Sequence, residues 1–307
     1  MGGRFPLALV FLIATSAACH ARELYVSNIH GSDRYSGRQL TTDSDGGGPF
    51  ATIAAAVRAA RPGDEIEIDN TGTPYSECVT LTATRGSGLP DFPIVIDGNG
   101  AILDGSRPVP DHAWEHYKAD VFRFTPRQQT YLCLFYEGRP VEEKQVKPTA
   151  LAPPVLKPRQ WCLLDSQVYF RVERGRTPDD YQLTQTGHAV GLTLYGVHDL
   201  VIRDLIVQGY QLDGVNAHDL VHRVELRGMT CRGNGRSGIC VAGASWVSIA
   251  ECLLGDNGRM QLRVEAPARV QMTDSDVLKS GVPRFAVQGG ELTIDGVRFT
   301  PANRRLP

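Results

Sequence analysis

A short apolar pattern recurs five times in the C-terminal part of the chain. The second residues of the five segments are at positions 202, 226, 249, 272 and 294, so successive copies are 24, 23, 23 and 22 residues apart. The segments are Val201–Val207, Glu225–Cys231, Ser248–Leu254, Gln271–Val277 and Thr293–Phe299. One such repeat cannot bury its own apolar face, and stacking the copies gives a continuous core. The period therefore predicts a solenoid.

The aligned segments predict three columns of side chains that point into the core. The columns are Ile202/Leu226/Ile249/Met272/Ile294, Leu205/Met229/Cys252/Ser275/Val297 and Val207/Cys231/Leu254/Val277/Phe299. Between the first two columns each copy has a polar pair, such as Arg203-Asp204, which predicts a bend between two short strands. Leucine-rich repeats have a similar period, but their signature is missing and no copy has a helical pattern. The sequence favours an all-β fold, a parallel β-helix.

The N-terminal part predicts one helix, some short strands and then an insertion. Apolar residues at positions 50, 53, 57 and 60 lie on one face of a helix over Pro49–Ala60, which Arg61–Asp64 ends. Strand-like segments follow at Glu65–Ile68 and Pro93–Gly105. From 106 to 186 the chain is rich in proline, aromatic and charged residues with scattered strand-like pieces, and we expect a β-rich insertion there.

The first 21 residues have the order of a secretory signal. Arg4 precedes the apolar run Leu7–Ala14, and small residues follow through Ala18. The run is about half of the roughly 20 apolar residues that a membrane-spanning helix needs, so we expect no span. This predicts a protein that is secreted, periplasmic or on the cell surface. The expected organisation is a signal peptide (1–21), an N-terminal cap with the first coils (22–105), the insertion (106–186) and the β-helix repeats (187–307).

Charge and motifs exclude several classes of function. The chain has 32 basic and 34 acidic residues and a net charge of −2, which gives no field of one sign to attract nucleic acid. Nucleotide-binding loops, the serine-hydrolase elbow and the zinc-protease motif are missing from the sequence. Nucleic-acid, nucleotide and zinc-protease functions are therefore not expected.

Cysteine and asparagine positions give structural expectations. In an exported chain with seven cysteines, Cys133 with Cys162 is the disulfide that we would test first. Cys231 and Cys252 are in the inward columns and are expected to be buried thiols. Asn234 and Asn257 are in matched positions, three residues after the third column, where stacked asparagines would bond the turn backbone.

These features together resemble the right-handed β-helix (pectate-lyase-like) superfamily of bacterial secreted proteins. The resemblance is carried by Tyr25–Gly37 with Pro49–Ile53 and Arg61–Asp64, by Pro93–Gly98, and by the coils from His198 to Phe299. It implies that the predicted helix caps the open end of the core. It also implies a polysaccharide partner and allows Ca²⁺ as a cofactor. The superfamily includes lyases, hydrolases, epimerases and proteins without catalysis, so the resemblance does not specify an activity.

The segment Gln211–His218 has the best candidate for catalysis. Asp213 is suited to act as a general acid or calcium ligand, Asn216 to bond a sugar, and His218 to remove the proton next to a uronate carboxylate. Strict strand alternation would point Asp213 away from Asn216 and His218, but the bend at Gly214 can relax it. The structural interpretation is that Asp213 only forms a turn and that the other two are solvated.

Arginines on successive coils can neutralise the carboxylate of a uronic acid. Arg236, Arg259 and Arg263 are the candidate substrate-binding residues, and their alternative interpretation is an ordinary charged surface. The position equivalent to Asp213 in the next coil is Ser237. An inverting glycosidase built from stacked carboxylates is therefore disfavoured, and Asp256 could supply a second carboxylate only from a turn.

The sequence thus predicts a polysaccharide-acting protein of lyase type on an acidic, uronate-containing glycan. A glycoside hydrolase is one alternative. The other is a non-catalytic β-helix that binds glycan or associates end to end through its last coil near Arg304 and Arg305. The catalytic residues expected for the lyase are Asp213 and His218, and the metal ligands are unknown.

Overall fold

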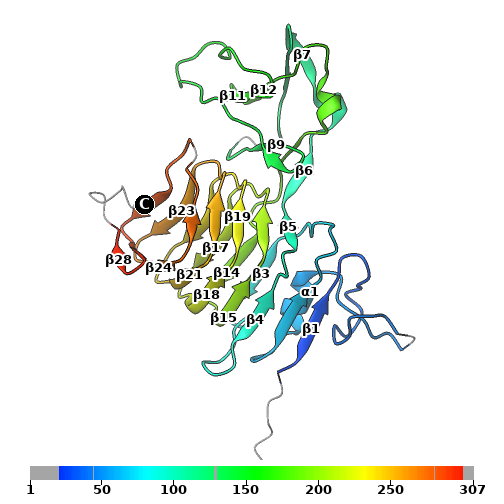
Figure 1. The fold of residues 1–307 in the computed structure, drawn as a ribbon, viewed down its shortest axis with the longest axis vertical. Helices are drawn as coiled ribbons and strands as arrows, with labels where there is room; N and C mark the ends of the chain where they lie inside the picture. The colour runs from blue at the N-terminus through cyan, green and yellow to red at the C-terminus, as the bar shows by residue number, and fades with distance from the viewer. Residues whose placement is uncertain (1–20, 44, 128–129, 280, 300–307) are drawn as a thin grey trace, which may run out of the picture.

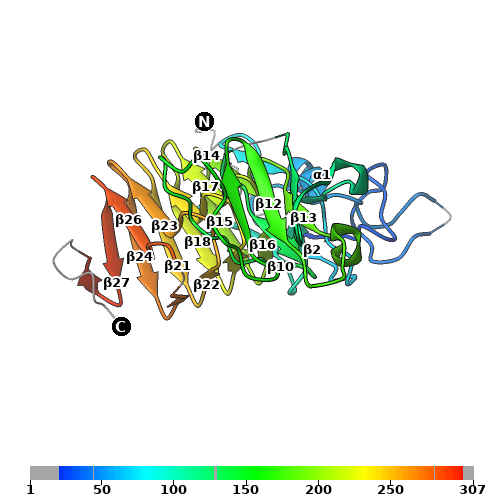
Figure 2. The same ribbon diagram turned by 90° about the horizontal axis from the view of Figure 1, so that it is seen from above.

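The chain forms a parallel solenoid whose strands stack along one long axis. The computed structural model describes residues 21–43, 45–127, 130–279 and 281–299, so the expected signal peptide, except its last residue, and the tail after Phe299 lie outside the described residues. Figure 2 shows the stack running from the helix at one end to the last strands at the other. The predicted parallel β-helix is confirmed.

Three parallel sheets form the wall of the solenoid. The nine-stranded sheet contains β1 (Glu23–Val26), β2 (Glu65–Ile68), β4 (Ile94–Asp97), β15 (His198–Arg203), β18 (His222–Arg227), β21 (Trp246–Ala250), β24 (Arg269–Thr273), β27 (Glu291–Ile294) and β28 (Val297–Arg298). The five-stranded sheet contains β5 (Ile102–Asp104), β16 (Ile206–Gln208), β19 (Thr230–Arg232), β22 (Leu253–Gly255) and β25 (Asp276–Val277). The six-stranded sheet contains β3 (Val79–Thr82), β14 (Leu192–Tyr195), β17 (Asp213–His218), β20 (Ser237–Val241), β23 (Met260–Glu265) and β26 (Phe285–Gln288). Each uninterrupted coil contributes one strand to each sheet.

The register of the strands confirms the first predicted column. Ile202 pairs with Leu226, Leu226 with Ile249, and the row continues through Met272 to Ile294. The second column is buried through Cys252, but Val297 is 50% exposed. The reason is that β28 folds back antiparallel onto β27 instead of starting another sheet. The prediction that Val297 points into the core is therefore wrong.

The polar bends between the first and second sheets require a left-handed backbone. Asp204, Glu251 and Asp274 have φ of 52°, 56° and 46°, and Gly228 has φ of 59° at the equivalent position. Glycine and, among side-chain residues, aspartate tolerate this conformation best. The bend residues are therefore selected by backbone geometry and carry no chemistry of their own.

The predicted capping helix is present as α1 (Ile53–Ala59), and it is shorter than expected. Thr52 caps it, because its hydroxyl accepts the amide of Ala55. Phe50 is buried and forms a bridge with Val26, so this stretch is extended and outside the helix. The carboxylate of Glu77 accepts the amides of Ile53 and Ala54 at 2.8 and 3.0 Å. The helix covers the first coil, as expected.

The insertion projects from the solenoid between β5 and β14 (Figure 1). It contains two four-stranded antiparallel sheets, ordered β10-β9-β13-β6 and β11-β12-β8-β7. Its strands are β6 (Ser106–Pro108), β7 (Glu115–Lys118), β8 (Val121–Phe124), β9 (Leu134–Tyr136), β10 (Arg139–Pro140), β11 (Trp161–Leu164), β12 (Gln167–Arg171) and β13 (Thr184–Thr186), with 3-10 turns at Asp111–Ala113 and Pro178–Tyr181. It has an apolar core separate from that of the coils.

The insertion packs against the coils at a glycine contact. A Cβ on Gly235 would lie 1.7 Å from the backbone oxygen of Tyr131. We therefore expect Gly235→Ala to lower the free energy of unfolding by about 1–3 kcal/mol. The added methyl group fits only if the backbone at Gly235 or at Tyr131 moves. Urea unfolding measures this. Gly281→Ala, where an added Cβ meets no atom within 4 Å, is the control. Equal stability of the two variants would contradict the tight contact.

An asparagine ladder lies at the turn between the five-stranded and six-stranded sheets. The side-chain oxygen of Asn257 accepts the backbone amide of Asn234 at 2.9 Å, and that of Asn234 accepts the amide of Tyr210 at 3.2 Å. The amide of Asn257 donates to the backbone oxygen of Cys231 and to Gln261. Both asparagines are buried. The predicted structural role is confirmed.

The six described cysteines are free. Cys162 packs with Leu156, Leu164 and Tyr169 inside the insertion, whereas the sulfur of Cys133 lies 3.2 Å from the Cβ position of Gly258 in the coils. The expected Cys133–Cys162 disulfide is therefore not formed. No helix of the described residues is long and apolar enough to cross a membrane.

Candidate functional site

The carboxylate of Asp213 is the centre of a buried polar network at the start of β17. Asp213 is 0% exposed. Its oxygens accept hydrogen bonds from Nε and Nη2 of Arg236, from the hydroxyl of Ser237 at 2.5 Å and from the amide of Asn216 at 2.8 Å. The hydrogen bond brings Asp213 and Asn216 together, although Gly214 continues the strand and forms no bend. Asp213 raises the pKa of Arg236.

This network makes Asp213 a positioning residue. A general acid must reach the oxygen of the leaving group, and a calcium ligand must have a free lone pair. Asp213 has no exposed surface, and four donors occupy its two oxygens. The part of this network that is exposed at the surface is the guanidinium side chain of Arg236, which is 20% exposed.

His218 lies at the opposite end of β17 from Asp213. His218 is five positions after Asp213, which corresponds to roughly 16 Å along an extended strand. Asp213 and His218, which the sequence predicts as the catalytic pair, therefore lie at opposite ends of one strand. Its ring contacts Tyr195 edge-on at 5.0 Å, and Nδ1 lies 3.3 Å from the carboxylate of Asp219. Tyr195 is 48% exposed, so an aromatic ring and an imidazole lie together on the outer face.

Arg263 belongs to the same face, two strands farther along. The register runs from Asn216 through Cys240 to Arg263, whose guanidinium pairs with Glu265. Burial raises the pKa of Cys240 to about 12, so its thiol is not a nucleophile. Arg236, Asn216, His218 and Arg263 thus share one outer face, which can bind an anionic or polar chain.

Arg259 precedes the strand residue that pairs with Ser237, one coil beyond Arg236, and its charge lies near a cleft between the insertion and the coils. The cleft has a volume of about 450 Å³. Its lining residues are Cys133, Pro140, Val141, Glu142, Glu143, Gln145 and Trp161 from the insertion and Asp256, Asn257, Gly258, Gly281 and Val282 from the coils. Carboxylates from two distant parts of the chain therefore face one space.

Glu143 is a carboxyl group of this cleft with a perturbed pKa. Burial raises the pKa of its carboxyl, and the nearby charge of Arg259 opposes that shift. Asp256 is exposed, in a left-handed turn after β22 with φ of 55°. Glu142 accepts a hydrogen bond from Gln160 at 2.8 Å. Enzymes that use acid–base chemistry often have one carboxyl group with a raised pKa and a second, ionised carboxylate in the same site.

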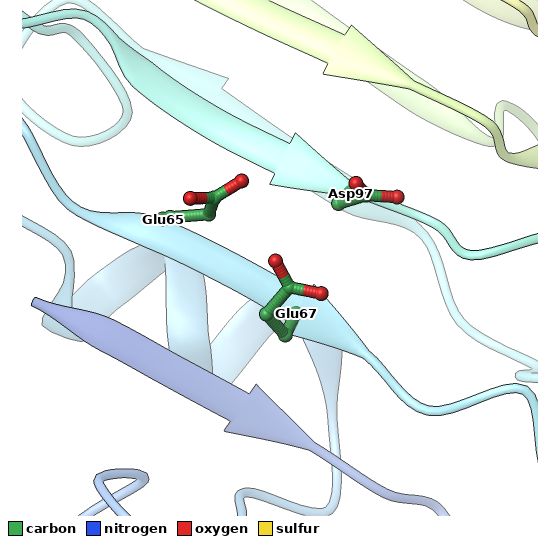
Figure 3. Close-up of side chains that lie close together, drawn as sticks. All are labelled: Glu65, Glu67 and Asp97. Atoms are coloured by element: carbon green, nitrogen blue, oxygen red, sulfur yellow. The ribbon is translucent and has the colours of Figure 1, made fainter.

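A third group of carboxylates lies on the outer face of the nine-stranded sheet. Glu65 and Glu67 on β2 and Asp97 on β4 point toward one another, with one ligand atom of each within 4.8 Å of the others (Figure 3). Arg203 donates to Glu65 at 2.7 Å and to Asp97 at 2.5 Å, and Asn99 donates to Glu67. Ca²⁺ takes six to eight oxygen ligands. With a guanidinium already bound, this group does not fit calcium.

No family model and no curated protein matches the sequence. A solved structure titled "Glycoside hydrolase" superposes with a TM-score of 0.62 and 12% identity, over 88% of this chain and 74% of that one. The chain is a parallel β-helix protein. At that identity the likeness establishes the fold of the β-helix protein and no activity.

Two other similar structures have TM-scores below 0.5. A complex of XylC with xylose has a TM-score of 0.46 and 12% identity, over 88% of this chain and 68% of that one. The pectate lyase Pel9A has a TM-score of 0.34 and 11% identity, over 92% and 79%. The assignment of the β-helix protein to its fold therefore depends on the first superposition and on the observed coils.

The sequence analysis missed the cleft because no local motif marks it. Glu143 is inside the insertion, where strand pairing was not predicted, and Asp256 was considered as a second carboxylate only from a turn. The signal that could have found them is the length of the insertion. Its 81 residues between β5 and β14, from 106 to 186, must fold onto some part of the coils.

Proposed function

We propose that the β-helix protein is carbohydrate-active and hydrolyses glycosidic bonds in the cleft between the insertion and the coils. One observation carries this proposal: Glu143, with its pKa raised by burial, faces the same cleft as Asp256. The solved glycoside hydrolase with the same fold supports it as an analogy. Export from the cell, which the N-terminal sequence predicts, is part of the proposal.

In the proposed reaction Glu143 donates its proton to the glycosidic oxygen as the bond to the anomeric carbon breaks. Asp256 supplies the second carboxylate. It acts on the anomeric carbon through water if the two carboxyl groups are about 6.5–9.5 Å apart, and directly if they are about 5–5.5 Å apart. In the route through water, Asp256 takes one proton from the water as the water oxygen bonds the anomeric carbon. In the direct route Asp256 first forms an ester with the anomeric carbon; water that gives a proton to Glu143 then adds to this carbon, the ester bond breaks and Asp256 is released as a carboxylate. Gln145, which is exposed at the cleft, is placed to bond a sugar hydroxyl.

The second candidate is the lyase that the sequence predicted, and a specific observation favours it. The outer face of the six-stranded sheet presents Arg236, Arg263 and His218 together with the exposed ring of Tyr195. Guanidinium groups can bind a uronate carboxylate, and an imidazole can remove the adjacent proton. In this reaction the electron pair of the broken C–H bond forms a C=C bond as the glycosidic oxygen leaves.

The two reactions are distinguished by their products. Purified protein is incubated with a panel of neutral and uronate polysaccharides, and reducing ends and absorbance near 235 nm are measured together. The expected result is new reducing ends without absorbance, because hydrolysis makes no C=C bond. Absorbance that rises with the reducing ends would overturn hydrolysis and support elimination. No product from any polymer would overturn both and leave a binding protein.

A further inference from the structure

A separate pocket of about 390 Å³ lies within the insertion, at the opposite edge of the β10-β9-β13-β6 sheet from the cleft. Three strand spacings, roughly 14 Å, separate the two edges. The polar lining of the pocket comes mainly from Arg107, His112, Arg127, Gln185 and Thr186. Prolines and Phe124 form the apolar part of its wall. It is therefore distinct from the site proposed for hydrolysis.

The side-chain oxygen of Gln185, a residue that lines this pocket, lacks a hydrogen-bond donor. Among the described residues, its side-chain oxygen is the buried polar side-chain atom without a hydrogen-bond partner. Gln185 is directly opposite Arg107 in the pairing of β13 with β6, so their side chains lie on the same face of the sheet. Buried acceptors are nearly always satisfied in folded proteins. The oxygen has almost no accessible surface, so a donor in the pocket reaches it when the Gln185 side chain turns toward the cavity.

The charge of the pocket is positive. None of its twelve lining residues is acidic, and within the described part of the chain neither Arg107 nor Arg127 forms an ion pair. Burial, and next the charge of Arg107, lowers the pKa of neighbouring His188. Unpaired guanidinium groups are the preferred partners of planar carboxylates.

We propose that this pocket binds one acidic sugar unit of the glycan. The sugar carboxylate pairs with Arg107 and Arg127, and a ring hydroxyl donates to the side-chain oxygen of Gln185 once that side chain turns toward the pocket. The apolar face of the ring packs against the prolines of the wall. The inference rests on the proposed action on carbohydrate and deepens it, because it names the substrate class as uronate-containing. It does not depend on which reaction occurs elsewhere.

The test is isothermal titration of the full chain with trigalacturonate, its methyl ester and sodium sulfate. We expect saturable binding of trigalacturonate, at least tenfold weaker binding of the uncharged ester, and no competition by sulfate at equal concentration. Arg107→Gln and Gln185→Met should each weaken binding of trigalacturonate at least fivefold. Gln185→Met keeps the shape of the side chain and removes the unpartnered acceptor, so its thermal midpoint should not fall. Arg176→Gln, on the insertion outside the pocket, is the matched control.

Several outcomes would contradict the proposal that this pocket binds an acidic sugar. These are equal binding of the ester, full competition by sulfate, wild-type affinity in both pocket variants, and a loss of affinity in Arg263→Gln that Arg107→Gln does not share. The binding assay requires no turnover, which separates this proposal from hydrolysis. Binding without product from any polymer would overturn only hydrolysis, and hydrolysis of neutral glycans without binding of trigalacturonate would overturn only the pocket.

Discussion

Glu143→Gln is expected to lower kcat for glycan hydrolysis by a factor of about 10²–10⁴, which is the usual contribution of a general acid. The amide has nearly the same shape but no proton to donate to the leaving oxygen. Stability should change little, because Gln145 and the cleft walls still surround the side chain. The measurement is the rate of reducing-end release under saturating substrate, with unfolding curves for both proteins.

The matched control is Glu115→Gln, on β7 of the insertion and outside the cleft. It should keep the wild-type rate, and an equal loss in both variants would contradict a specific role of Glu143. A pH profile gives a second readout. The charge of Arg259 holds the pKa of Glu143 down against the effect of burial, so Arg259→Gln should raise that pKa. The alkaline limb of kcat/KM, where the acid loses its proton, should then move to higher pH.

Asp213→Ala is expected to lower the free energy of unfolding by about 3–5 kcal/mol, the range found when one member of a buried ion pair is removed. Arg236 would keep a largely buried positive charge without its partner, and Ser237 and Asn216 would lose their acceptor. Many domains have a total stability of only about 5–15 kcal/mol. Urea unfolding followed by circular dichroism measures the loss.

Asp276→Ala is the control for Asp213→Ala, because Asp276 is an exposed strand residue in a later coil. Its stability should stay within about 0.5 kcal/mol of wild type. The pair of variants also separates two roles of Asp213. A fully stable Asp213→Ala protein without activity would show that the carboxylate acts on substrate and would contradict its assignment as a positioning residue.

The coils could be predicted from sequence because the register of a β-helix is repeated in the chain itself. Ile202, Leu226 and Ile249 have the same environment one coil apart, so their alignment reveals the core. The asparagine ladder was predictable for the same reason. The end of the pattern was not, because β28 turns back through a local hairpin that leaves Val297 exposed.

The candidate sites could be predicted only where they lie on one strand or on adjacent coils. Asp213, Asn216 and Arg236 were each named as candidates from the sequence, but the contact of Arg236 with Asp213 and the burial of Asp213 depend on donors from the next coil. Glu143 and Asp256 are more than 100 residues apart in the chain. Only the docking of the insertion brings them to one cleft, and no repeat or motif encodes that docking.

The pairing of β6 with β13 has a consequence for how the chain folds. Ser106 is opposite Thr186 in this antiparallel pair, so the first and last residues of the insertion are neighbours once it has folded. Closing a loop of some 80 flexible residues costs more entropy than closing one of a few residues. Once the insertion has folded, this extra entropy cost no longer applies to the coil. The ends of β5 and β14 are then held as close together as they would be by a tight turn. The insertion can therefore be gained, lost or exchanged in evolution as a unit, while the winding of the coils stays the same.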